Sequence, residues 1–168
     1  MGNRGTKLGA DGEFRAEGID ADAFDYLTVA MLLLFVPVRG LNGCFLPQTV
    51  TFIVVGGIVQ AVFMLLAIWA RRHLGRNWSA EVRIGEGHEL IRSGPYRVLR
   101  HPIYTAMLGM LVGSAIASGQ YHALVGIALL IVAYLRKTRL EEEILRKTFG
   151  NDFEAYFRDS WALVPYVF

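Results

Sequence analysis

Apolar and polar segments alternate along the chain in a pattern that predicts membrane-spanning helices. Four apolar stretches stand out, at residues 24–38, 49–70, 103–118 and 121–135. The second stretch carries no charged residue and is long enough to cross a bilayer core, which needs roughly 20 helical residues. The third and fourth stretches are shorter, so we expect tilt or local thinning of the bilayer to absorb the mismatch.

The third and fourth stretches are separated only by Gly119 and Gln120, which predicts a tight helical hairpin. Small residues predict where the helices pack, because glycines let helices approach closely in lipid. These packing positions are Gly56, Gly57, Gly109 and Gly113.

Basic residues lie almost entirely on one side of the predicted spans. Of the 17 lysines and arginines, only Arg39 falls between the first and second stretches, and none falls in the hairpin turn. The others precede the first stretch, lie in the 71–102 loop or follow the fourth stretch. The positive-inside rule then places both termini and the 71–102 loop in the cytoplasm, which requires an even number of spans.

The predicted fold is therefore an all-α integral membrane protein with about four transmembrane helices, the last two forming the hairpin. Residues 1–22 are polar and lack the apolar core of a signal peptide, so we expect a flexible cytoplasmic tail. Residues 23–136 are expected to form the transmembrane domain. Residues 137–168 are expected to form a cytoplasmic helical segment that belongs to the same domain.

The apolar spacing after residue 137 predicts an amphipathic helix that ends at Gly150 and Asn151. A second short helix is expected at residues 153–157. The aromatic residues that follow suit a membrane interface. They are Trp161, Tyr166 and Phe168.

Composition supports a membrane protein and narrows the possible chemistry. The 168-residue chain is 54% hydrophobic and 19% charged, and its net charge of +2 gives no indication of nucleic acid binding. The single cysteine, Cys44, excludes an internal disulfide and a cysteine-based zinc site. The four histidines form no HExxH motif, so we predict no metal site, and no GxSxG or complete dinucleotide fingerprint is present.

Polar residues of types used in binding and catalysis lie at the predicted cytoplasmic ends of the third and fourth stretches. Pro102 suits the first turn of a helix, which makes His101 a residue of the helix cap and leaves nearby N–H groups for an anion. The hairpin is expected to bring Arg100, His101 and Tyr104 close to the Glu141–Glu142 pair. The result would be a pocket with both signs of charge beside lipid.

Each of these features also has an ordinary structural interpretation. Arginines at the end of a span often serve only topology, and glutamates on a helix beside the membrane often face water. A single histidine at a helix start is often a cap, and interfacial tyrosines are often anchors. The convergence of all four features at one corner favours a functional site.

Two longer motifs resemble the isoprenylcysteine carboxyl methyltransferases and the related membrane phospholipid methyltransferases. The segment "HELIRSGPYRVLRHPIYTAML" (88–108) is similar to their block around R-H-P-x-Y, and "RLEEEILRKTFGNDFEAYF" (139–157) is similar to their C-terminal block. "LGRNWS" (74–79) resembles their L-G-x-x-W-S. The resemblance covers roughly residues 50–168. Ala106 stands where the family often has glycine, and Phe153 where tyrosine is common.

The resemblance implies an integral membrane methyltransferase that uses S-adenosyl-L-methionine bound on the cytoplasmic side, with a lipid-type acceptor. The implied cofactor-binding residues are His88, Leu90, Gly94, Tyr96, Arg100, His101, Pro102, Tyr104, Glu141 and Glu142. A carboxylate acceptor needs no base but needs a cation to align it, whereas an amine acceptor must lose a proton. The candidate catalytic residues are Arg100, Arg136, Arg139 and Glu142.

Several functions stay open on the sequence. Carboxyl O-methylation of an isoprenylcysteine-like acceptor is the first hypothesis, and N-methylation of a phospholipid headgroup amine is its rival. A sterol-reductase-like oxidoreductase with a nicotinamide cofactor and a non-enzymatic scaffold are alternatives of other classes. We expect a multi-pass protein of a prokaryotic inner membrane, and the oligomeric state is left open.

Overall fold

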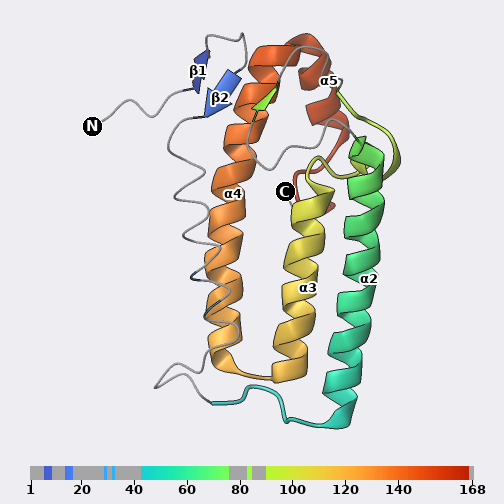
Figure 1. Ribbon diagram of the computed structural model, residues 1–168, viewed down its shortest axis with the longest axis vertical. Helices are drawn as coiled ribbons and strands as arrows, with labels where there is room; N and C mark the ends of the chain where they lie inside the picture. The colour runs from blue at the N-terminus through green and yellow to red at the C-terminus, as the bar shows by residue number, and fades with distance from the viewer. Residues whose placement is uncertain are drawn as a thin grey trace, which may run out of the picture.

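Three long helices running side by side form the body of the protein (Figure 1). The computed structural model describes residues 6–8, 14–16, 29, 32, 43–75, 83–84 and 90–166. Helix α3 (Pro102–Ser118) lies between α2 (Val50–Leu74) and α4 (Tyr121–Phe149), and it packs against both. The short helices η2 (Gly94–Arg97) and α5 (Asn151–Asp159) lie at one end of the bundle.

Helices α3 and α4 are joined by Gly119 and Gln120 alone, and a glycine follows the last residue of each helix. Gly119 takes the left-handed conformation (φ +63°) between the two helices, and Gly150 (φ +52°) ends α4 at the predicted position. The predicted fourth span and the predicted amphipathic helix are one continuous helix of 29 residues. Residues 136–143 are mostly good helix formers, so nothing interrupts α4 before Gly150.

A small antiparallel sheet was not predicted from the sequence. Its strands are β1 (Thr6–Leu8), β2 (Phe14–Ala16) and β3 (Arg83–Ile84), with β2 in the middle. Strands of two or three residues are too short for an alternating pattern to be detectable. The chain is therefore helical in its main body, as predicted, with this small sheet in addition.

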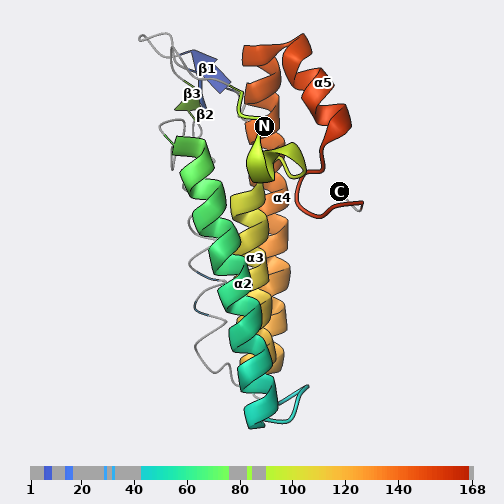
Figure 2. The ribbon, with the colours of Figure 1, turned by 90° about the vertical axis from the view of Figure 1, so that its right-hand side faces the viewer.

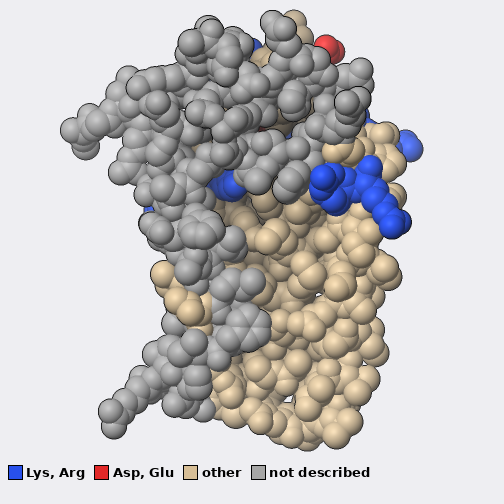
Figure 3. Space-filling model, in the orientation of Figure 1, with Lys and Arg blue, Asp and Glu red and all other residues tan. Residues whose placement is uncertain are grey.

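Among the described residues, one helix is long and apolar enough to cross a bilayer alone, namely α2. Only Gly56 and Ala70 of its 25 residues are buried. Figure 3 shows a broad uncharged surface on the lower part of the molecule and basic residues toward the upper end. The predicted first span lies outside the described residues except for Val29 and Leu32, so the count of four spans stays a prediction.

Glycines set the close contact between α2 and α3. A Cβ atom on Gly56 would lie 2.5 Å from the carbonyl oxygen of Gly113, and one on Gly109 would overlap the ring of Phe63. By contrast, a Cβ atom on Gly57 would meet nothing within 4 Å. The predicted packing role is therefore confirmed for Gly56, Gly109 and Gly113 and is wrong for Gly57.

This contrast predicts opposite effects for two adjacent glycine substitutions. Gly56→Ala should lower the free energy of unfolding by about 1–3 kcal/mol, because the added methyl group must push α2 and α3 apart. Gly57→Ala should leave stability unchanged or raise it by up to about 1 kcal/mol through helix propensity. Thermal unfolding in detergent measures both, and equal effects of the two substitutions would contradict the packing described here.

Candidate active site

The start of α3 is held by residues 157–166, the last turn of α5 and the chain that follows it, which we call the C-terminal segment. The N–H groups of Arg100 and His101 donate to the carbonyl oxygens of Trp161 (2.7 Å) and Ala162 (3.1 Å). The N–H of Trp161 in turn donates to the carbonyl oxygen of Val98 (2.9 Å). Pro102 begins the helix, as predicted. The N–H groups of the two residues directly before the helix are therefore bonded to the protein itself.

The hairpin brings the two predicted clusters together. The Nε of Arg100 donates to Oε1 of Glu142 at 2.6 Å, and the hydroxyl of Tyr104 donates to Oε1 of Glu141 at 2.5 Å. His101 lies between the glutamates, with Nδ1 3.2 Å from Glu141 Oε2 and Nε2 3.4 Å from Glu142 Oε1. We call these five residues the charged cluster. Their predicted proximity across about 40 residues of sequence is confirmed.

Arg100 is the most constrained member of the charged cluster. Its side chain is 7% exposed, and its Nη1 donates to the carbonyl oxygens of Phe157 (3.2 Å) and Ser160. The guanidinium also lies over the Phe157 ring, 4.2 Å from its centroid. Most of its donors are therefore used within the protein, which favours a positioning role over direct contact with an acceptor.

The contacts of His101 and Glu142 favour the charged form of each side chain. Burial lowers the pKa of His101, but its contacts with Glu141 and Glu142 outweigh burial, so the pKa is raised from its ordinary value. Burial raises the pKa of Glu142, but its close contact with His101 and its ion pair with Arg100 outweigh burial, so the pKa is lowered. The close approach of His101 Nε2 to Glu142 lacks hydrogen-bond geometry, so this buried atom has no hydrogen-bond partner among the described residues.

The other predicted residues of the 88–102 block have different surroundings. Tyr96 is buried in η2, and burial raises the pKa of its phenol. Gly94 has a positive φ of +59° and lies against the ring of His73, whose Nε2 is 3.1 Å from the hydroxyl of Ser93. Leu90 is half-buried. His88 lies outside the described residues.

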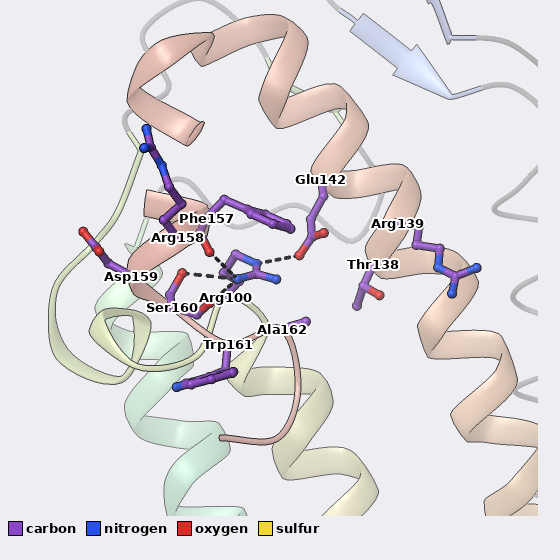
Figure 4. A pocket seen from close by; sticks show the side chains of 10 residues that line it. All are labelled: Arg100, Thr138, Arg139, Glu142, Phe157, Arg158, Asp159, Ser160, Trp161 and Ala162. Carbon is purple, nitrogen blue, oxygen red and sulfur yellow. Dashed lines mark hydrogen bonds and ion pairs between the residues drawn. The ribbon is translucent and has the colours of Figure 1, made fainter. Parts of the chain in front are cut away.

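A cavity of about 640 Å³ opens between α4 and the C-terminal segment (Figure 4). Arg139 contributes to its wall and lies on the far side of Thr138 from Arg100. Arg136, the other predicted cation of α4, is exposed and is not part of this wall. The lining residues are Arg100, Thr138, Arg139, Glu142, Phe157, Arg158, Asp159, Ser160, Trp161 and Ala162.

The C-terminal residues and His73 were not predicted to belong to the site. Phe157, Ser160 and Ala162 contact Arg100 or His101, or line the cavity, mostly through backbone atoms. Backbone acceptors carry no side-chain signal, so a motif cannot reveal them. His73 belongs to the last turn of α2, and its contact with Gly94 depends on how α2 packs.

The helical fold, the apolar surface of α2 and the charged cluster define a class of membrane protein with a polar site at one end of its helices. The sequence model of the family described as phospholipid methyltransferase matches residues 51–152, which include most of α2 and all of α3 and α4. The chain belongs to this family. The predicted family relationship is thereby confirmed.

Individual relatives agree with the family. A protein of Oryza sativa subsp. japonica described as a probable protein-S-isoprenylcysteine O-methyltransferase is 26% identical over 118 residues, covering 68% of this chain and 58% of the relative. Protein-S-isoprenylcysteine O-methyltransferase B of Arabidopsis thaliana is 25% identical over 118 residues, covering 70% and 57%. The chain thus spans a little over half the length of these relatives.

A solved structure shows a similar fold. The eukaryotic intramembrane Ras methyltransferase, isoprenylcysteine carboxyl methyltransferase, superimposes with a TM-score of 0.59 at 17% sequence identity. The similarity covers 89% of this chain and 51% of that chain. At this identity the likeness concerns the fold.

Two neighbouring glutamates provide a test of the buried ion pair. Glu142→Gln should lower the free energy of unfolding by about 3 kcal/mol, because it leaves the buried charge of Arg100 uncompensated. Glu143 is exposed and pairs with Lys147 at 2.7 Å, so Glu143→Gln should cost less than about 0.5 kcal/mol. Denaturant unfolding at neutral pH measures the difference.

The pH dependence of the free energy of unfolding also distinguishes the two glutamates. The folded-state pKa of Glu142 is lowered, so its stabilisation is present above the ordinary glutamate pKa and is lost as the pH falls through the folded-state value. Glu142→Gln should remove this part of the acid destabilisation, whereas Glu143→Gln should keep it. Parallel acid profiles for wild type and Glu142→Gln would contradict the assignment.

Proposed function

We propose that this protein transfers the methyl group of S-adenosyl-L-methionine to an acceptor carried by a membrane lipid or a prenyl group. The observation that carries the proposal is the charged cluster beside a cavity, at one end of the helices of a chain in the phospholipid methyltransferase family. A water-soluble donor and a lipid-borne acceptor can meet only where a polar pocket borders the bilayer.

The residues present fit the donor. S-adenosyl-L-methionine carries a sulfonium, an ammonium and a carboxylate, and when bound it supplies an activated methyl group. Glu141 and Glu142 can bind an ammonium or ribose hydroxyls. His101 offers a buried N–H at Nε2 without a hydrogen-bond partner among the described residues, which suits an anionic group.

Other cofactor-binding roles rest on the resemblance and stay part of the proposal. They concern His88, Leu90, Gly94, Tyr96, Pro102 and Tyr104. Within the charged cluster, Tyr104 holds Glu141 through its hydroxyl. Arg100 positions Glu142 and the C-terminal segment, so we assign it a positioning role.

Carboxyl O-methylation is the acceptor chemistry that the charges favour. A carboxylate is already nucleophilic and needs a cation for alignment, and Arg139 lines the cavity without an ion pair among the described residues. Arg136 lies one turn earlier on α4 and is a second candidate. The relatives described as isoprenylcysteine O-methyltransferases point to an isoprenylcysteine-like acceptor.

N-methylation of a phospholipid amine is the second candidate, supported by the description of the matching family. An amine acceptor must lose a proton to a base. Contacts with two carboxylates raise the pKa of His101 above its ordinary value, and both of its ring nitrogens already lie against these carboxylates. His101 is therefore engaged by Glu141 and Glu142 and is not placed as a free base for an amine, which favours the carboxylate acceptor.

The proposed placement is a membrane with the charged cluster at its cytoplasmic face and four spans. The relatives named above are plant proteins, so they give no support to a prokaryotic inner membrane. The predicted division at residues 136 and 137 falls inside α4. We therefore propose one catalytic unit, built from the helical bundle and the C-terminal segment together.

Labelled methyl transfer tests the proposal. The purified protein should transfer methyl groups from labelled S-adenosyl-L-methionine to a farnesylated cysteine, and base should release the label as volatile methanol. Label that resists base and appears in phosphatidylethanolamine products would support N-methylation instead.

Calorimetry tests the cofactor site separately. The wild type should bind S-adenosylhomocysteine, and His101→Ala and Glu142→Gln should weaken binding by about tenfold or more. Glu143→Gln should bind as the wild type does. Binding of NADPH without binding of S-adenosylhomocysteine would favour a reductase, and wild-type affinity in both site variants would favour a scaffold or another site.

A further inference from the structure

Four exposed apolar side chains lie on the C-terminal segment and on the loop just before α3. They are Val98, Trp161, Val164 and Tyr166, between 38% and 86% exposed, and we call them the interface patch. The rings of Trp161 and Tyr166 lie 5.4 Å apart, and a backbone hydrogen bond joins Trp161 to Val98. Clustered exposed apolar side chains indicate a contact surface more than scattered ones do.

The C-terminal segment that carries the patch is fixed to the protein on its other side. Ala162 and Leu163 are each 3% exposed, and Leu163 packs in the apolar core with residues of α3 and α4. The hydroxyl of Thr105 donates to the carbonyl oxygen of Leu163 at 2.6 Å. The segment therefore has one buried side and one exposed aromatic side.

The patch lies at the level where the apolar part of α3 begins. Helix α5 turns back from the end of α4, and the C-terminal segment returns beside η2 and the first turn of α3 (Figures 1 and 2). The hydrogen bonds from Arg100 and His101 to Trp161 and Ala162 place it there. Because α3 becomes apolar after Pro102, this level is the boundary between polar and apolar surface.

Charge favours a lipid surface as the partner. Exposed Arg97 precedes Val98, and exposed Arg158 lies three residues before Trp161. Asp159 is the acidic residue adjacent to this pair. Tryptophan and tyrosine with flanking arginines are typical of membrane interfaces, where the rings sit at headgroup level and the guanidiniums attract anionic lipids.

We propose that the interface patch docks into the boundary between the headgroups and acyl chains of an anionic bilayer. This inference goes beyond methyl transfer and does not depend on the identity of the cofactor or the acceptor. Trp161 belongs both to the patch and to the wall of the cavity. Docking therefore places the cavity at the edge of the bilayer.

Depth-dependent fluorescence quenching tests the proposal. The chain has three tryptophans, Trp69, Trp78 and Trp161, so Trp69→Phe with Trp78→Phe leaves Trp161 as the reporter. The protein is placed in nanodiscs of phosphatidylcholine and phosphatidylglycerol. The phosphatidylcholine is brominated near either the glycerol end or the methyl end of its acyl chains.

The matched control moves the reporter to the exposed side of α5. It carries Ala155→Trp together with Trp69→Phe, Trp78→Phe and Trp161→Phe, because Ala155 is exposed on a helix expected to face water. Both proteins must show the thermal transition of the wild type, so that the comparison concerns folded protein.

The expected result is quenching of Trp161 by shallow bromine that exceeds the quenching at position 155 by about twofold or more, with weaker quenching by deep bromine. Adding Arg97→Gln and Arg158→Gln to the Trp161 reporter protein should reduce quenching in these anionic nanodiscs. The same substitutions should not reduce quenching in nanodiscs of phosphatidylcholine alone. Quenching of Trp161 no stronger than at position 155 would overturn the proposal. A patch buried against a second copy of the chain would give that result, together with two copies per nanodisc.

Discussion

The ion pair between Arg100 and Glu142 joins three parts of the chain that are far apart in sequence. Arg100 stands just before α3, Glu142 lies on α4, and the same guanidinium binds backbone oxygens of the C-terminal segment. A buried charge needs a partner with good geometry, because desolvation costs several kcal/mol per ion. Removing either partner therefore affects both the hairpin and the C-terminal segment.

The charged cluster depends on the different lengths of α3 and α4. Helix α4 has 29 residues and α3 has 17, so α4 continues past the start of α3 and carries Glu141 and Glu142 alongside Arg100 and His101. Helix α5 then turns back, which lets the C-terminal segment close the cavity from the other side (Figure 4). One continuous helix thus connects the apolar body with the polar end.

Much of this arrangement could be predicted from the sequence because it follows from strong local signals. Three helix ends could be predicted, from Pro102, the 119–120 turn and Gly150. The pairing of α3 with α4 followed from the two-residue connection between them. The approach of Arg100 to Glu142 followed from the hairpin alone. The packing role predicted for Gly57 was wrong. Adjacent positions of a helix face different directions, and only the packing of α2 decides which of the two faces α3.

Other parts of the site have no local signal. The carbonyl oxygens of Phe157 and Ser160 bind Arg100 through backbone atoms, which any residue could supply. The N–H groups of Arg100 and His101 donate to carbonyl oxygens about 60 residues away in the sequence, which no local pattern could reveal. The sheet of β1, β2 and β3 has strands too short for periodicity to detect.

A double-mutant cycle on cofactor affinity tests the central claim, that the Arg100–Glu142 pair organises the donor site. The affinity for S-adenosylhomocysteine would be measured by calorimetry for wild type, Arg100→Gln, Glu142→Gln and the double variant. We predict a coupling energy of about 1 kcal/mol or more, because either single substitution already disrupts the shared unit. Strictly additive losses would show that the two side chains act independently and would contradict the account.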